Sequence, residues 1–130
     1  MIKFQKKIPK ILVIGDLMID YYLLGSSDRI SPESPVPIID INNESTHLGG
    51  AGNVVNNLKA LGAKVDIISV IGNCNVSNEL IGLLNDIEID TKFLFRQRDR
   101  ITSKKSRVIS SHQQVIRFDR EQTKEISSKS

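Results

Sequence analysis

Asp16 stands at the end of a short apolar run, where a carboxylate can meet a ligand. Residues 11–15 read Ile-Leu-Val-Ile-Gly, and Asp20 follows four residues after Asp16. In an open α/β sheet, ligands bind beyond the carboxyl ends of the strands. Asp16 could therefore accept hydrogen bonds from two hydroxyls of a polyol such as a sugar. The alternative is a carboxylate that caps the following turn, and the motif alone does not decide between the two.

Residues 48–53, Leu-Gly-Gly-Ala-Gly-Asn, open a helical pattern. Glycines let a backbone approach a ligand closely, and a helix N-terminus favours negative or hydroxyl-rich groups, so Gly49, Gly50 and Asn53 are candidate ligand residues. A dinucleotide-binding fingerprint would follow the first strand directly and would have a small residue at position 55, which is Val55. We therefore expect no dinucleotide site of the Rossmann type. No Gly-Lys-Ser/Thr occurs, so a phosphate-binding loop of the Walker type is excluded.

Lys105 and Arg107 are separated by one residue in the segment 102–107. Alternate residues of a strand share a face, so the two cations could clamp one phosphate. Gln114 and Arg117 follow in the next segment. The residues alone slightly favour the alternative, a solvent-facing strand with an ordinary basic pattern.

Composition excludes several classes of protein. Hydrophobic residues make up 39% and charged residues 25%, which is ordinary for a globular domain. One cysteine, Cys74, excludes an intrachain disulfide and a structural zinc site. No apolar run reaches the ~18–20 residues that span a bilayer, so we expect no membrane contact and a cytoplasmic location. His47 and His112 have no neighbours that suggest metal or triad chemistry.

Charge is distributed unevenly along the chain. Residues 1–91 contain seven basic and eleven acidic side chains, whereas residues 92–130 contain eleven basic and four acidic ones. Such a basic segment can bind nucleic acid, an acidic surface or a small phosphorylated ligand. No helix-turn-helix, RRM or KH pattern accompanies it, so we expect no nucleic-acid partner.

The elements that must position these residues follow from apolar periodicity and turn residues. We expect a buried strand at 11–15, a turn at 25–28, and two peripheral strands within 17–46 around three prolines at 31–37. A helix from 53 to 61 buries Val54, Val55, Leu58 and Leu61 and ends at Gly62. A strand at 65–71, a helix capped by Ser77 and a hairpin around 111–114 complete an α/β fold with right-handed crossovers.

Taken together, residues 11–20, 29–37 and 48–62 resemble the ribokinase-like (PfkB) sugar kinases. The segment 29–37 reads Arg-Ile-Ser-Pro-Glu-Ser-Pro-Val-Pro, and with residues 104–119 it is similar to the D-glycero-β-D-manno-heptose-7-phosphate kinases. Members of that subfamily often form the N-terminal half of a bifunctional heptose kinase/adenylyltransferase.

The resemblance implies the N-terminal part of a ribokinase-like three-layer α/β sandwich with a small β-sheet lid. Residues 1–130 would be an N-terminal fragment of one kinase domain, with lid strands at approximately 17–46 and 92–110 and the C-terminal ATP-binding part absent. The complete enzyme would use ATP and Mg²⁺ to phosphorylate the anomeric hydroxyl of a heptose 7-phosphate for ADP-heptose and lipopolysaccharide core synthesis. The fragment alone would bind neither cofactor and would be inactive.

The resemblance also assigns roles to the candidate residues. Sugar hydroxyls would be bound by Asp16, Gly49, Gly50 and Asn53. The 7-phosphate would be held by Lys105 and Arg107, and Gln114 would also bind substrate. The catalytic Asp is expected beyond residue 130, no metal ligand is expected in the chain, and the lid would pair two subunits. The alternatives are a ribokinase-like kinase of another specificity and a non-catalytic sugar-phosphate-binding or dimerisation module.

Overall fold

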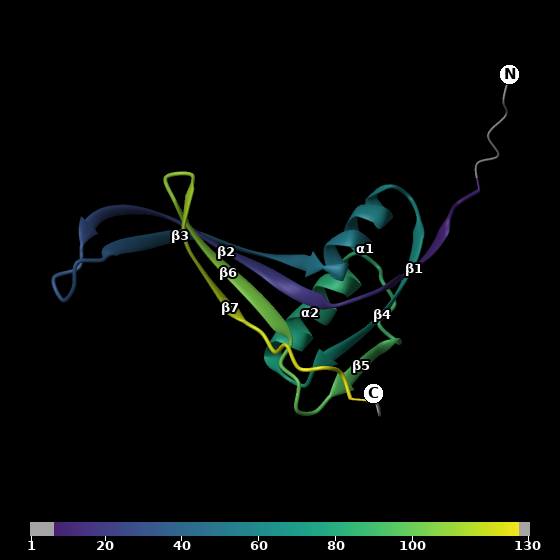
Figure 1. Ribbon diagram of the computed structural model, residues 1–130. Coiled ribbons are helices and arrows are strands. Elements are labelled where there is room, and N and C mark those ends of the chain that lie inside the picture. Colours follow the sequence, from purple (N-terminus) through teal and green to yellow (C-terminus); the bar gives the residue numbers. More distant parts are fainter. Residues whose placement is uncertain (1–6, 128–130) are drawn as a thin grey trace, which may run out of the picture.

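Residues 7–127, which the computed structural model describes, form two β-sheets and two helices (Figure 1). The elements, in chain order, are β1 (Lys10–Ile14), β2 (Leu17–Ile30), β3 (Pro37–Gly50), α1 (Ala51–Ala60), β4 (Lys64–Gly72), α2 (Asn75–Asp86), β5 (Leu94–Gln97), β6 (Ser103–Ser110) and β7 (Gln113–Arg120). One sheet is parallel and has the order β1-β4-β5, and the other has the order β3-β2-β6-β7. The second sheet extends away from the helices, and the tip of the β2–β3 hairpin lies farthest from them (Figure 1).

The hydrophobic core lies between the two helices and the sheets. Alternate residues of β4, Val65 and Ile67, are buried against side chains of the helices, as the period of two along a strand requires. The fully buried aliphatic side chains come from four elements and are Ile19, Val55, Ile67, Ile71, Leu80 and Leu84. Because the start of β2 contributes to this core, the long second sheet is anchored to the body at that end.

The opposite face of the three-stranded sheet is apolar and exposed. Leu12 is 52% exposed, Ile14 71% and Phe95 47%. Large aliphatic and aromatic side chains that share one face of a sheet are usually covered by another layer of a protein.

The segment 25–28 is not the turn that its residues predict. β2 continues through it, and the pairing with β3 shifts register between Leu24 and Gly25 and again between Ser26 and Arg29. A Cβ at Gly25 would lie 2.4 Å from the Asp40 carbonyl oxygen, so the glycine lets the two backbones approach. Irregular pairing of this kind replaces the turn, because it bends a long hairpin without ending it.

Helix α1 begins at Ala51, two residues before the predicted start, and only part of its predicted apolar face is buried. Val55 is fully buried, whereas Val54 is 48% exposed and Leu61, which follows the last helical residue, is 83% exposed. The predicted end is confirmed, because Gly62 has a φ of 83° and its N–H donates to the Lys59 carbonyl.

Ser77 is not the N-cap of α2, and the prediction was wrong on this point. Cys74 occupies the cap position, and Ser77 is fully buried in the first turn. Its hydroxyl donates to the Gly72 carbonyl at 2.7 Å and lies 2.7 Å from the Thr102 hydroxyl oxygen. Thr102 in turn accepts the Gly72 N–H at 2.8 Å. Ser77 therefore ties the end of β4 to the segment before β6.

The thiol of Cys74 should ionise near neutral pH. Partial burial acts to raise its pKa, but hydrogen bonds with the Ser77 side chain and with the backbone of Thr102, Ser77 and Val76 outweigh burial and lower the pKa to about 7. Alkylation by iodoacetamide should therefore show a midpoint about two units below the ordinary 9.0. The same chain unfolded in urea is the control, and equal midpoints in the two states would contradict the expectation.

The β6–β7 hairpin closes with a two-residue turn rather than the predicted four-residue loop. Ser111 and His112 have φ values of 49° and 66°, and Ser110 pairs directly with Gln113. Two successive positive φ values define the turn type that matches the twist of a hairpin. Gln113 and Gln114 therefore belong to β7.

Asn-Gly in place of Ser111-His112 should stabilise the chain, because this dipeptide adopts two positive φ values with little strain. We expect a gain of about 0.5–1 kcal/mol in the free energy of unfolding, measured by urea titration. His112→Val, which puts a β-branched side chain at a positive φ, should lower stability. A destabilised Asn-Gly variant would be inconsistent with this turn.

Two strands differ from the expected lid range of 92–110. β5 lies within that range but pairs with β4 in the three-stranded sheet, whereas β7 lies beyond it and joins the four-stranded sheet through β6. Leu94 of β5 packs against the hydrophobic core, which places this strand on the body of the fold. Neither helix found within residues 7–127 is long and apolar enough to cross a membrane.

Candidate functional site

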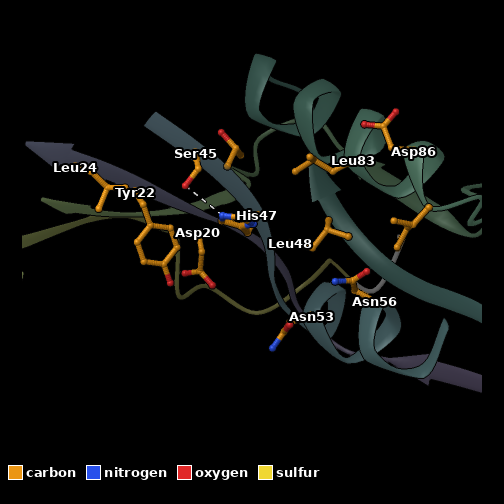
Figure 2. A pocket seen from close by; sticks show the side chains of 12 residues that line it. Asp20, Tyr22, Leu24, Ser45, His47, Leu48, Asn53, Asn56, Leu83 and Asp86 are labelled. Carbon is orange, nitrogen blue, oxygen red and sulfur yellow. Dashed lines mark hydrogen bonds between the residues drawn. The ribbon is translucent and has the colours of Figure 1, made fainter. Parts of the chain in front are cut away.

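An open cleft of ≈ 650 Å³ lies where β3 passes the two helices (Figure 2). The strands line one side of it with Asp20, Tyr22 and His47, and α1 contributes Asn53 and Asn56. Leu83 and Asp86 of α2 line the opposite side. The cleft therefore combines a carboxylate, side-chain amides and an imidazole with apolar walls, a composition that suits a small polar ligand.

Asp20 lies directly over the backbone of Gly49. The two residues sit on adjacent strands, and a Cβ at position 49 would lie 2.6 Å from the Asp20 Oδ2 and 2.8 Å from the Met18 Cγ. Only glycine leaves room for the carboxylate at this position. The side chain of Asp20 is 22% exposed, so it remains accessible from the cleft.

Arg107 of β6 holds the same carboxylate. Its Nη1 donates to the Asp20 Oδ1 at 2.5 Å, and its Cζ lies 5.3 Å from the centre of the Tyr22 ring. The hydrogen bond with Asp20 raises the pKa of Arg107 above its ordinary value. The guanidinium is thus held by an ion pair and a cation–π contact, and it orients the carboxylate that lines the cleft.

Lys105 is also paired with carboxylates. Its Nζ lies 3.1 Å from the Glu121 Oε2 and 3.2 Å from the Asp119 Oδ2. Hydrogen bonds with Glu121 and Asp119 raise the pKa of Lys105. Lys105 and Arg107 lie on one face of β6, as alternation predicts, because their partners Asp20 and Tyr22 on β2 alternate in the same way.

Asp16 is not among the residues that line the cleft, whereas Asn53 is. The Asp16 carbonyl accepts the Ala51 N–H at 2.9 Å, and a Cβ at Gly50 would lie 2.6 Å from that oxygen. Gly50 has a φ of 55°, which glycine adopts without strain. Asp16 and Lys105 both line a second cavity of ≈ 320 Å³. Asp16 and Gly50 therefore fix the junction at which α1 begins, beside the cleft.

The comparisons with known proteins place the chain in a family. Residues 8–130 match the profile described as pfkB family carbohydrate kinase. The chain belongs to the PfkB family of carbohydrate kinases. The resemblance found in the sequence is confirmed.

Curated relatives in the PfkB family are similar over nearly the whole chain. The chain is 59% identical to the bifunctional protein HldE of Aliarcobacter butzleri over 95% of its own length and 26% of the relative's. It is 57% identical to the bifunctional protein HldE of Sulfurimonas denitrificans over 94% of its own length and 26% of the relative's. The chain therefore spans about a quarter of the curated relatives that it matches.

Solved structures show the same fold at low identity. A carbohydrate kinase from Agrobacterium tumefaciens superposes with a TM-score of 0.66 at 23% identity, over 87% of this chain and 36% of that one. The nucleoside kinase of Methanocaldococcus jannaschii is described as an archaeal member of the ribokinase family. It superposes with a TM-score of 0.61 at 23% identity, over 87% of this chain and 37% of that one. The predicted α/β, ribokinase-like fold class is confirmed.

In this PfkB chain the structure brings together some of the predicted site residues and separates others. Gly49, Arg107 and Lys105 lie on or beside the strand face that carries Asp20, and Asn53 lines the same cleft as Asp20. Gln114 is exposed on β7 opposite Ile109. It is five residues along the strand from Asp119, roughly 16 Å at the usual rise.

Sequence reasoning left two residues of the site without a role. Asp20 was noted only for its spacing from Asp16. Side chains alternate between the two faces of β2, so the register of the β2–β3 hairpin would have placed Asp20 beside Gly49. Asp119 faces Lys105 across the β6–β7 pair. A two-residue turn at 111–112 would by itself put Phe118 opposite Lys105, and the register shift between Val108 and Ile109 brings Asp119 there instead.

Proposed function

We propose that this chain is the sugar-phosphate-binding portion of an ATP-dependent heptose-7-phosphate kinase. The reaction transfers the γ-phosphate of ATP to the anomeric hydroxyl of D-glycero-β-D-manno-heptose 7-phosphate, in the cytoplasm, for ADP-heptose and lipopolysaccharide core synthesis. Its identity of 57–59% to proteins named bifunctional protein HldE supports this substrate class. The observation that carries the proposal is the Asp20 carboxylate, which lines a polar cleft and is bonded to a cation on the adjoining strand.

The cleft residues would divide the recognition of the sugar. The Asp20 carboxylate accepts hydrogen bonds from two hydroxyls, because an ionised carboxylate has only acceptor sites. Asn53, in the first turn of α1, offers both a donor and an acceptor. Gly49 leaves room for the Asp20 carboxylate that would meet the ring. Lys105 and Arg107 lie on the side to which the 7-phosphate would extend.

The sheet β3-β2-β6-β7 would act as the lid of this kinase. In phosphoryl transfer a protein contributes positioning and charge stabilisation, and a closing element excludes water. The long hairpins extend from the body at one end, as such a covering element requires (Figure 1). We propose that the same sheet pairs two subunits.

ATP and Mg²⁺ would be bound by parts of the domain other than this chain. The exposed apolar face with Leu12, Ile14 and Phe95 supports a further layer over the three-stranded sheet. The match to about 36% of a solved carbohydrate kinase agrees with a partial domain. Alone, the chain would supply substrate binding without phosphate transfer.

Calorimetry on the 130-residue chain tests the proposal. Heptose 7-phosphate should bind more tightly than unphosphorylated heptose, fructose or a nucleoside. A preference for an unphosphorylated sugar or a nucleoside would favour another ribokinase-like specificity. ADP release above background in a coupled assay would contradict the assignment of catalysis to other parts of the enzyme.

A further inference from the structure

The cations assigned to phosphate binding are neutralised within the chain. Six charged side chains of β2, β6, β7 and the residue after β7 form a cluster in which three cations face three carboxylates: Lys105, Arg107, Arg117, Asp20, Asp119 and Glu121. The basic excess of residues 92–130 therefore does not produce a free positive patch here. A phosphate that binds these cations therefore competes with the carboxylates that already pair with them.

Asp119 is the carboxylate at the centre of this charged cluster. Its Oδ2 lies 3.2 Å from the Lys105 Nζ, and its Oδ1 lies 3.2 Å from the Arg117 Nε. Its charge also helps to raise the pKa of Arg107, after the larger effect of Asp20. One carboxylate thus bridges two cations with separate oxygens and acts on a third, as a bound phosphate would.

Register explains this convergence. Asp119 is directly opposite Lys105, and Arg117 is directly opposite Arg107, in the β6–β7 pair. Directly paired residues of adjacent strands point to the same face, so the three cations and Asp119 project together. Arg117 is 51% exposed, whereas Lys105 and Asp119 are 20% exposed, so Arg117 is free to reorient toward a ligand.

We propose that Asp119 competes with the phosphate of the substrate for the position beside Lys105 and Arg117. When the phosphate displaces Asp119, Arg117 becomes a third phosphate ligand in addition to Lys105 and Arg107. The inference rests on the proposed function and deepens it by naming residues that set phosphate selectivity. In the Arg117–Asp119 pair the arginine is 51% exposed, and ion pairs of exposed side chains contribute about 0–1 kcal/mol, so this contact can be exchanged. A phosphate dianion offers three acceptor oxygens and nearly twice the charge of a carboxylate, so it can displace Asp119 where a neutral hydroxyl cannot.

Asp119→Asn tests the competition. The substitution keeps the shape and removes the charge, and it should lower the Kd for heptose 7-phosphate about tenfold, the value of one charge-assisted hydrogen bond. The Kd for unphosphorylated heptose should stay within about twofold. Glu121→Gln is the matched control, since it removes an equal charge and another Lys105 partner but leaves Arg117 paired. Its gain should be clearly smaller.

Arg117→Gln tests the third ligand. Alone it should weaken heptose 7-phosphate binding without changing the Kd of unphosphorylated heptose, and in the Asp119→Asn background it should abolish most of the gain. Equal gains in Asp119→Asn and Glu121→Gln, or a gain that survives Arg117→Gln, would overturn the inference while leaving the sugar site intact. If neither sugar binds to the unsubstituted chain or to any variant, the proposed function fails, and this inference fails with it.

Discussion

Asp20→Ala is expected to lower the affinity of the chain for heptose 7-phosphate by about a hundredfold, the loss of two hydrogen bonds to a charged group. The carboxylate is the one acidic group that lines the cleft from β2, and its removal also leaves Arg107 without its partner at 2.5 Å. The substitution should therefore weaken sugar binding and leave the Arg107 side chain less well positioned. Calorimetry with phosphorylated and unphosphorylated heptose measures the effect, which should appear with both ligands.

The matched control is Asp40→Ala. Asp40 also lies in the β2–β3 hairpin and pairs with an arginine, Arg29, at 3.5 Å, but both side chains are at least 60% exposed and neither lines the cleft. Its loss should leave the affinity within about twofold, because exposed ion pairs contribute little. If Asp20→Ala binds heptose 7-phosphate as tightly as Asp40→Ala does, the cleft is not the sugar site.

Gly49→Ala offers an independent approach to the same carboxylate. The added Cβ would lie 2.6 Å from the Asp20 Oδ2, so the carboxylate must move although its charge remains. We expect an intermediate loss of affinity, because a displaced acceptor still attracts hydroxyls but no longer meets them at hydrogen-bond geometry. This variant separates the position of Asp20 from its charge.

Local patterns predicted the elements that depend on neighbours in sequence. The apolar alternation of residues 65–71 identified β4, and Gly62 identified the end of α1, because backbone conformation and burial there follow from adjacent residue types. The resemblance to ribokinase-like kinases added the family and fold. Both kinds of prediction were confirmed.

Long-range pairing could not be predicted in the same way. Asp20 and Arg107 are 87 positions apart, and they meet because β2 and β6 are parallel neighbours with a particular register. A one-residue change of register would turn each side chain to the other face. The sequence showed that Lys105 and Arg107 share a face, but the carboxylates that neutralise them became apparent only from the sheet.

Ser77 illustrates a second limit. A serine three residues before an apolar helical face fits an N-cap, but its hydroxyl is used instead in a buried network with Gly72 and Thr102. The partner Thr102 is 25 residues away. Propensity describes what a residue does in an isolated helix, whereas tertiary contacts determined its role here.

Gly72→Ala should be the most destabilising single-methyl change in the chain. The added Cβ would lie 2.2 Å from the Arg100 carbonyl oxygen and 2.9 Å from the Thr102 nitrogen, and both atoms belong to backbone that cannot rotate away. Relief requires the segment 100–102 to move, which would break the 2.8 Å hydrogen bond from the Gly72 N–H to Thr102 and expose the buried Ser77 network to rearrangement. Overpacking together with a lost buried hydrogen bond should cost about 3–5 kcal/mol of the free energy of unfolding.

Urea unfolding of Gly72→Ala and of Gly82→Ala measures this effect against a matched control. Gly82 lies inside α2, and a Cβ there would meet nothing within 4 Å, so the same added methyl should stabilise the helix by about 0.5–1 kcal/mol. The two variants should therefore move the unfolding midpoint in opposite directions. An unchanged midpoint for Gly72→Ala would mean that the segment before β6 is not held against the end of β4. In that case β6, which carries Lys105 and Arg107, would not be fixed relative to the core at its first residues.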